Sequence, residues 1–246
     1  MHIDTIRVGI VGAGANTRTY HIPGLQAIEG VEIVSVCNRS RASSERVAGA
    51  FGIPVVYEDW RELVQAPDTN AIVIGTWPYM HCPVTLEALE AGKHVLCEAR
   101  MARDAAEARA MYEAARRRPA LVAQVVPSPF TLSVDRTVKR LLAEGYLGDV
   151  LAIEVREGLG FLNPEAPLHW RQDFELSGFN TLSLGIWYES VLRWVGHATR
   201  VMAMGKTFVK MRPDPETGVP RAVRVPEHLD VLADMECGAQ LHVWLS

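Results

Sequence analysis

The chain has 246 residues, of which 48% are hydrophobic, and its formal net charge is −4. This composition is typical of a globular protein that buries one large core or two modest ones, and it excludes a disordered chain. The balance of 25 basic and 29 acidic residues leaves no broad basic face or polybasic segment, which argues against nucleic-acid and membrane partners and favours a small-molecule substrate.

The four cysteines, Cys37, Cys82, Cys97 and Cys237, are scattered along the chain without a Cys-x-x-Cys pair or a histidine cluster at metal spacing. This pattern predicts reduced core thiols, with no metal site and no disulfide framework. The N-terminus lacks a basic segment followed by an apolar run, and no apolar stretch is long enough to span a bilayer. We therefore expect a cytoplasmic protein.

The most informative motif follows an apolar strand predicted at 6–11, where the sequence continues Gly12-Ala13-Gly14 and then a helix begins. Two glycines let the backbone turn tightly and approach a pyrophosphate, which the free N–H groups of the helix can bind. Thr17 stands where a third glycine is usual, and an ordinary strand-to-helix turn remains the alternative. A second apolar strand at 31–37 gives the context that favours a nucleotide site.

The first half of the chain alternates short apolar strands with helical patterns, which indicates βαβ units and a parallel, doubly wound α/β sheet. We predict strands at 6–11, 31–37, 55–57, 71–74, 94–97 and 121–125, and helices at 17–28, 41–51, 59–65, 83–91 and 104–118.

The alternation of strands and helices ends after Val126. The segment Pro127-Ser128-Pro129 predicts a joint there between a dinucleotide-binding domain at 1–126 and a second domain at 127–246. We expect this second domain to combine helices with strands. The predicted elements are an amphipathic helix that ends at Glu144, a strand at 150–157, a long helix at 177–195, a Pro-rich loop at 212–226, and a hairpin of 229–236 and 239–245 that turns at Cys237-Gly238.

Several motifs in this order resemble the Gfo/Idh/MocA family of NAD(P)-dependent oxidoreductases, named for glucose-fructose oxidoreductase and inositol dehydrogenase. They are Gly12-Ala13-Gly14, His21, Gly52-Ile53-Pro54, Tyr57-Glu58-Asp59, Thr76-Trp77-Pro78 with His81, the run from Ala88 to Glu98, the run from Glu144 to Val150, and the helix from Gly185 to Gly196. The run from Ala88 to Glu98 is the most specific. The resemblance implies a Rossmann domain, an α+β domain with an open, mostly antiparallel sheet, a substrate cleft between them, and a sugar, cyclitol or related polyol as substrate.

The chain departs from this family at its catalytic positions. The family places Lys-Pro after the glutamate that matches Glu98, with the lysine beside the reacting carbon, but this chain has Ala99-Arg100. The family also places an aspartate and a histidine four residues apart in the second domain, and the matching residues here are Ser183 and Trp187. These two positions share one helical face, so the face can still line the cleft without the acid–base groups.

Oxidation of an alcohol needs a base within about 3 Å of the hydroxyl proton and a donor to steady the developing oxyanion. Arg100 can supply the donor but not the base, because a guanidinium stays protonated. His81, His169 and Tyr188 are candidate bases, with the respective alternatives of structuring the cofactor side, a loop and the helix packing. The catalytic residues are left open among the cleft candidates Glu98, Arg100, His169 and Tyr188.

The cofactor, NADP or NAD, is expected to be held by one set of residues in the first domain. This set is Gly12, Gly14, Ala15, Asn16, Asn38, Arg39, Ser40, Thr76, Trp77, His81 and Glu98. After the second strand the chain has Asn38 and two arginines, Arg39 and Arg41, in place of an acidic residue that would hold a ribose diol. This pattern favours a 2′-phosphate and therefore NADP, although both arginines could instead be solvated residues at a helix start.

Two other functions fit the same residues. A non-catalytic NAD(P)-binding sensor or partner subunit would keep the nucleotide site after losing the lysine, aspartate and histidine, and a structural protein would keep only the fold. The sequence stops at Ser246, directly after an apolar strand, whereas proteins of this family usually continue with further strands, so we expect a truncated domain. Because an exposed sheet edge favours pairing with another chain, we also expect a homo-oligomer.

Overall fold

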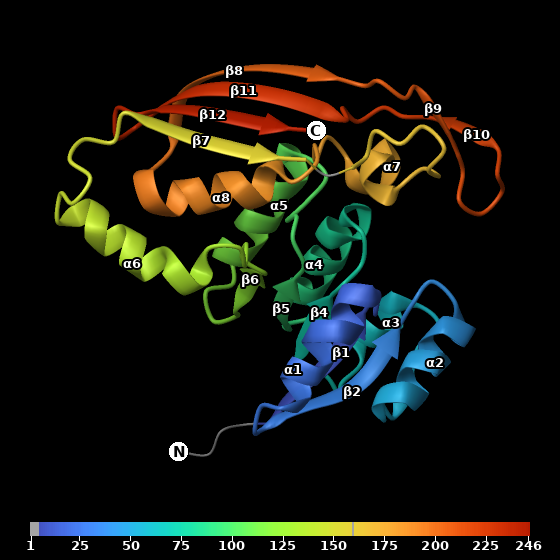
Figure 1. Ribbon diagram of the computed structural model, residues 1–246. Helices are drawn as coiled ribbons and strands as arrows, with labels where there is room; N and C mark the ends of the chain where they lie inside the picture. The colour runs from blue at the N-terminus through green and yellow to red at the C-terminus, as the bar shows by residue number, and fades with distance from the viewer. Residues whose placement is uncertain (1–4, 159) are drawn as a thin grey trace. The chain divides into compact units, whose positions relative to one another are not determined.

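The computed structural model describes residues 5–158 and 160–246, which divide after Val126 into two compact units (Figure 1). In the first unit a six-stranded sheet has the order β3-β2-β1-β4-β5-β6, and every strand pairing in it is parallel. This order confirms the predicted doubly wound α/β domain. Its elements are β1 (Ile6–Val11), η1 (Thr17–His21), α1 (Ile22–Gln26), β2 (Val31–Cys37), α2 (Arg41–Phe51), β3 (Val55–Val56), α3 (Trp60–Gln65), β4 (Ala71–Ile74), η2 (Pro78–Met80), α4 (His81–Glu90), β5 (His94–Cys97), α5 (Ala105–Arg116) and β6 (Ala123–Val125).

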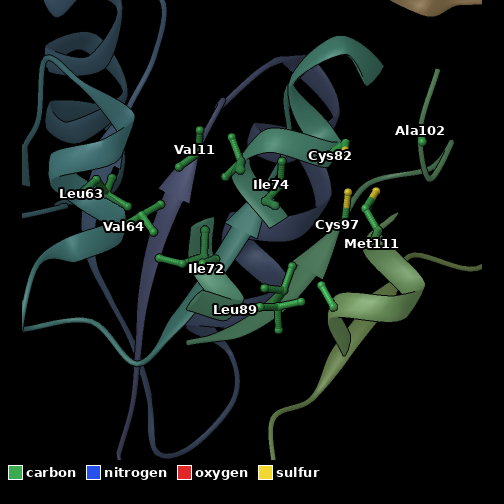
Figure 2. Close-up of a cluster of buried hydrophobic side chains, with 14 of the residues drawn as sticks. Val11, Leu63, Val64, Ile72, Ile74, Cys82, Leu89, Cys97, Ala102 and Met111 are labelled. Carbon is green, nitrogen blue, oxygen red and sulfur yellow. The ribbon is translucent and has the colours of Figure 1, made fainter. Parts of the chain in front are cut away.

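Apolar side chains cover both faces of this sheet, as expected for strands that are buried on two sides. On one face, residues of α3, α4 and α5 pack against β1, β4 and β5, and Figure 2 shows Leu63, Leu89 and Met111 from these three helices. On the other face Ile22 of α1 and Val47 of α2 pack against β1 and β2. The two layers hold the carboxyl ends of β1 and β4 next to each other, where the strand order reverses.

Side-chain caps start three helices of the first unit. Ser40, Asp59 and Asp104 each accept a hydrogen bond from a backbone N–H in the first turn of α2, α3 and α5. The helix predicted at 17–28 is interrupted, because a wide turn in which Ile22 N–H bonds Thr17 O precedes the short α1. Pro23 has no N–H to donate back into this turn, so a regular helix cannot run through it.

The second unit contains a four-stranded sheet of order β7-β12-β11-β8, in which only the β7–β12 pair is parallel. It therefore confirms the predicted α+β arrangement with an open, mostly antiparallel sheet. Its elements are α6 (Leu132–Ala143), β7 (Ala152–Glu157), η3 (Trp170–Gln172), α7 (Phe174–Ser177), α8 (Leu184–Val195), β8 (Ala198–Lys206), β9 (Met211–Pro213), β10 (Pro220–Ala222), β11 (His228–Met235) and β12 (Gln240–Leu245).

The hairpin of β11 and β12 is confirmed with its turn at Cys237-Gly238, where Gly238 N–H bonds Met235 O. Every second residue of each strand is buried, because one face of the sheet packs against α8. Leu241 and Leu245 of β12 are almost fully buried in this core, together with Val191 of α8.

The helix predicted at 177–195 is wrong in its first third. α7 ends at Ser177 because Gly178 adopts a φ of +65°, and Leu182 also has a positive φ of 49° before α8 begins at Leu184. Apolar residues in this connection extend the helical pattern of the sequence, but the backbone leaves the helical region at Gly178. Ser183 is consequently the residue that precedes α8, and not a residue of a helix interior.

The Pro-rich segment at 212–226 is also not the plain loop that the sequence predicts. β9 and β10 pair as a small antiparallel hairpin, whose turn is held by Asp214 accepting from the backbone N–H groups of Glu216 and Thr217. Arg212, on β9, is buried and donates to Glu227, which is buried as well. The Glu227 carboxylate also accepts from Gln172, and the Arg212 guanidinium donates to the carbonyl of Asn163. The pair therefore joins segments far apart in the sequence.

All four cysteines are free, and three of them, Cys37, Cys82 and Cys97, are buried. Cys237 is exposed at the hairpin turn, so the expectation of a core thiol is wrong there. Burial raises the pKa of Cys37 to about 11 and that of Cys97 to about 12, so these thiols stay protonated near neutral pH. Within the described residues no helix is long and apolar enough to cross a membrane.

Candidate functional site

The turn that follows β1 has room for glycine alone at position 12. Gly12 has a φ of +86°, and a Cβ placed there would lie 2.5 Å from Thr76 Cγ2 and 2.7 Å from the Thr76 backbone nitrogen. Gly14 is different, since the nearest atom to an added Cβ is Gly75 O at 3.7 Å. The turn therefore packs tightly against the end of β4 on one side and leaves the backbone of Gly14 open on the other.

A pocket of about 640 Å³ lies beside this turn, at the carboxyl ends of the strands of the first unit. Six of the eleven residues predicted to bind the cofactor line it: Gly12, Gly14, Asn38, Arg39, Thr76 and Trp77. Its volume is within the range of small-molecule and cofactor sites. Open α/β sheets bind nucleotides at this place, where the strand order reverses.

Thr76 carries a polar atom that the folded chain leaves for a ligand. Its Oγ1 is buried and has no hydrogen-bond partner among the described residues. A buried hydroxyl without a partner costs free energy, which a ligand with a phosphate or ribose oxygen recovers by hydrogen bonding. The tight turn at Gly12 and this hydroxyl fit a dinucleotide.

The loop after β2 is organised by the side chains that the sequence assigns to the cofactor. Asn38 Oδ1 accepts from Ala13 N–H at 2.6 Å, and Asn38 Nδ2 donates to Ser43 Oγ at 3.1 Å. Ser40 caps α2 by accepting from Ser43 N–H. Asn38 and Ser40 thus hold the glycine turn and the helix start in place, while Arg39 and Ser43 line the pocket.

The two arginines after β2 differ in their surroundings. Arg41 Nε lies 2.8 Å from Glu45 and Arg41 Nη1 lies 2.5 Å from Glu58, so both carboxylates compete for this guanidinium. Hydrogen bonds from Arg41 to Glu45 and Glu58 raise its pKa. Of the two arginines, Arg39 is the one whose residue borders the pocket.

Sequence reasoning missed part of the pocket wall. Trp60 and Arg61, at the start of α3, also line it, and the Arg61 guanidinium lies 4.4 Å from the centroid of the Trp60 ring. Tyr79 and Met80 complete the wall after β4. All four residues follow the carboxyl end of a predicted strand, and this position was the available signal for them.

Glu98, directly after β5, gathers two of the predicted residues. Its Oε1 accepts from Asn16 Nδ2 and lies 2.5 Å from His21 Nε2, while its Oε2 accepts from Ala99 N–H at 3.1 Å. Burial opposes ionisation of Glu98, but hydrogen bonds from His21 and Asn16 outweigh it and lower the pKa of the carboxyl. Ala15, next to this cluster, is exposed. Glu98 is therefore an anion that ties the helical turn after β1 to the end of β5.

His81 is fully buried and does not line the pocket. Its Nδ1 lies 2.7 Å from Arg100 O and its Nε2 lies 3.0 Å from Thr76 O. Burial lowers the pKa of His81 even though both carbonyl groups favour its protonated form. The ring thus links the backbone beside the unpaired Thr76 hydroxyl to the backbone of Arg100, a structural role on the cofactor side of the domain.

The two candidates in the second unit are both engaged in local structure. His169 Nδ1 accepts from Arg171 N–H at 3.2 Å, and burial lowers the pKa of its ring. Tyr188 Oη accepts from Ala198 N–H at 3.0 Å and so joins α8 to the start of β8. These bonds agree with the structural alternatives for His169 and Tyr188 that the sequence left open. Among the residues described, no group of three or more metal-binding side chains comes together.

Comparison with family models covers both units of the chain. A model described as an oxidoreductase family with an NAD-binding Rossmann fold matches residues 6–125. A second model, described as the GFO/IDH/MocA C-terminal domain, matches residues 136–246.

Individual proteins give the same result. Mouse trans-1,2-dihydrobenzene-1,2-diol dehydrogenase is 30% identical over 225 residues, which are 89% of this chain and 64% of the mouse enzyme. An oxidoreductase domain protein from Kribbella flavida has a TM-score of 0.88 and 26% identity, covering 98% of this chain and 67% of the other. A levoglucosan dehydrogenase solved with NADH and L-sorbose shares the fold, with a TM-score of 0.85 at 22% identity, over 98% of this chain and 67% of that one.

Proposed function

Because the chain belongs to the Gfo/Idh/MocA family of NAD-binding oxidoreductases, we propose that it transfers a hydride between NAD(P) and a carbon of a sugar, cyclitol or related polyol. The observation that carries this proposal is the pocket at the glycine turn, with its unpaired Thr76 hydroxyl. The substrate class is supported by relatives that are named for dihydrodiol and levoglucosan oxidation. The chain spans about two-thirds or less of these relatives, so the activity of the whole protein is part of the proposal.

Gly12, Gly14 and Thr76 would hold the pyrophosphate and the adjoining ribose, and Arg39 would contact a 2′-phosphate. The preference for NADP over NAD would depend on Arg39, because Arg39 lines the pocket and Arg41 does not. The nicotinamide ring supplies the acceptor for the hydride. Glu98 would hold the turn after β1 in place against the end of β5. Arg100 would stabilise the oxyanion that develops on the substrate.

A non-catalytic NAD(P)-binding sensor or partner subunit is the second candidate. Ala99, Ser183 and Trp187 favour it, because they replace the lysine, aspartate and histidine that the family resemblance implies. Glu98 does not compensate for this loss, since its carboxylate already accepts from Asn16 and Ala99 and contacts His21.

Two measurements separate these functions. Fluorescence of NADPH and NADH, titrated with the protein, reports binding, and a change in absorbance of the nicotinamide reports hydride transfer to or from levoglucosan, trans-1,2-dihydrobenzene-1,2-diol and myo-inositol. Micromolar binding with turnover supports the oxidoreductase. Binding without turnover on any of the three supports the sensor, and no binding of either nucleotide overturns both. The cytoplasmic location and the homo-oligomer remain predictions, which fractionation and light scattering would test.

A further inference from the structure

The two positions at which the chain lacks the family's acid–base pair are occupied by donors that bind a common carboxylate. Ser183 Oγ donates to Oε2 of Glu157, and Trp187 Nε1 donates to the same oxygen at 2.7 Å. Ser183 directly precedes α8 and Trp187 lies one turn into it, so one face of the helix presents both donors. Glu157 comes from a different element, the carboxyl end of β7.

The direction of the Glu157 side chain follows from the alternation of β7. Ile153 and Val155 point into the core of the second unit, and Glu157 is the next residue on that face. A carboxylate on an apolar face needs hydrogen-bond donors, and Ser183 and Trp187 supply them. Glu154 lies between Ile153 and Val155, so it points to the opposite, exposed face of the strand, where it pairs with Arg156.

Only half of the carboxylate is satisfied by these donors. Within 5–158 and 160–246, Glu157 Oε1 accepts no hydrogen bond and no cation pairs with the carboxylate. Phe130 packs against Trp187 with ring centroids 5.0 Å apart, which fixes the indole that holds Oε2. The arrangement thus orients one oxygen of a half-buried carboxylate and leaves the other able to accept a proton.

We propose that Glu157 is the general base of this oxidoreductase, with Ser183 and Trp187 as the positioning residues that hold its carboxylate. The proposal rests on the proposed function, because the family resemblance places positions 183 and 187 in the acid–base machinery. His169 and Tyr188 accept backbone hydrogen bonds, and Glu98 is held by three contacts. Glu157 is the carboxylate that accepts hydrogen bonds from Ser183 and Trp187, the residues at the two positions of the family's acid–base pair.

The proton and electrons balance in this step. The O–H bond of the substrate breaks and its proton passes to Glu157 Oε1, while the electron pair of that bond forms the carbonyl group. The hydride of the adjoining C–H bond would leave with its two electrons, for which NAD(P)⁺ bound at the glycine turn would be the acceptor. Glu157 would then release the proton to water before the next turnover.

The contact between Glu157 and Trp187 can be tested without any substrate. The chain has six tryptophans, and the indole N–H resonance that disappears in Trp187→Phe identifies Trp187. In Glu157→Gln this resonance is expected to move upfield, because an amide oxygen accepts a weaker hydrogen bond than a carboxylate. Glu154→Gln, on the opposite face of the same strand, should leave it in place. If the chemical shift of the Trp187 indole N–H does not change in Glu157→Gln, the proposal is overturned.

The base role is tested by turnover of whichever panel substrate the protein oxidises. Glu157→Gln should lower kcat about 100-fold to 10,000-fold, whereas NADPH binding and Glu154→Gln activity stay within about twofold of wild type. Glu157→Ala should regain part of its activity in sodium formate, whose carboxylate can replace the deleted group. Trp187→Phe should reduce kcat less than Glu157→Gln does, since it misplaces the base without removing it.

The outcomes separate this proposal from the function beneath it. Turnover that Glu157→Gln retains within threefold overturns the base assignment and leaves the oxidoreductase intact. Glu157→Ala without formate rescue, despite wild-type NADPH binding, also counts against the base. If no panel substrate is turned over while NADPH binds and the Trp187 resonance shifts, the oxidoreductase function fails and takes the base assignment with it.

Discussion

The side chain of Thr17 occupies the space that a Cβ at Gly75 would need. Thr17 is almost fully buried, its hydroxyl donates to Gly12 O at 3.2 Å, and the nearest atom to an added Cβ at Gly75 is Thr17 Oγ1. The residue that departs from the three-glycine pattern is therefore accommodated by a glycine on the adjacent strand end. Thr17 and Gly75 together close the β1 turn onto β4.

This fit predicts that Gly75→Ala damages both stability and nucleotide binding. The new methyl group collides with Thr17 and with the backbone oxygen of Gly12, so we expect a loss of about 1–3 kcal/mol in the free energy of unfolding. Urea denaturation measures this loss, and NADPH fluorescence should show weaker binding. Gly49→Ala in α2, where an added Cβ meets nothing within 4 Å, is the control and should be neutral or stabilising. Equal stability of the two variants would contradict the fit.

Arg39 should determine the preference for the phosphorylated cofactor. Removing a charge-assisted hydrogen bond costs about 1.5–3 kcal/mol, so Arg39→Gln is expected to raise the Kd for NADPH roughly 10-fold to 100-fold and to leave the Kd for NADH unchanged. Arg41→Gln should change neither by more than about twofold, because Glu45 and Glu58 share its guanidinium. Fluorescence titration of both nucleotides decides, and a selective loss in Arg41→Gln would reverse the assignment.

Because of Glu98, the free energy of unfolding should fall as the pH is lowered into the acid range. Its pKa in the folded chain lies below the ordinary value of 4.5, so its ionised form contributes stability above pH 4.5 and loses it as the pH falls through the folded pKa. Glu98→Gln removes this dependence. We expect the difference in unfolding free energy between wild type and Glu98→Gln to shrink between pH 5 and pH 3, as measured by urea denaturation. A difference that stays constant over this window would exclude the linkage.

Tyr188→Phe should lower stability and spare catalysis. The variant deletes the acceptor of the half-buried Ala198 N–H, and the loss of such a hydrogen bond costs about 0.5–1.5 kcal/mol. If the hydroxyl only joins α8 to β8, kcat and its pH profile remain those of wild type on any substrate that the protein oxidises. A displaced pH profile at unchanged stability would instead return Tyr188 to the list of candidate bases.

Removing one partner of the buried Arg212–Glu227 pair should destabilise the protein more than replacing both partners with apolar residues. Arg212→Met leaves the Glu227 carboxylate buried without its cation, which is expected to cost about 3–5 kcal/mol of unfolding free energy. The double variant Arg212→Met with Glu227→Leu should recover part of this loss, since it removes both charges. Thermal and urea denaturation compare the two, and a double variant less stable than the single one would contradict the reasoning.

The sequence predicts the first unit well because buried parallel strands produce apolar runs that few other structures produce. It predicts the second unit less well, because exposed strands there lack the alternation of apolar and polar residues that identifies a strand. β8 was not predicted because nearly all of its residues are exposed and carry no alternation. The helix predicted at 177–195 fails because apolar residues continue through Gly178, whose positive φ alone ends α7.

The candidate site shows the same division. Gly12, Arg39 and Thr76 follow strand ends, and this local rule places them at the pocket. The roles of His81 and Tyr188 depend on backbone partners far along the chain, which no spacing reveals. Glu157 was missed for a related reason: as one carboxylate in a strand with Glu154, it is distinguished only by meeting Ser183 and Trp187 in the folded unit.

The parallel pairing of β7 with β12 also bears on how the chain folds during synthesis. β7 has β12 as its only neighbour in the sheet, and the two strands are joined by a connection that contains every other strand of the second unit. β12 must therefore be synthesised before β7 can form its hydrogen bonds in the sheet, whereas β1 and β2 of the first unit can pair soon after they are synthesised. Until then β7 is a bare edge with apolar residues on one side, so translational pausing before β12 should make the nascent chain dependent on chaperones.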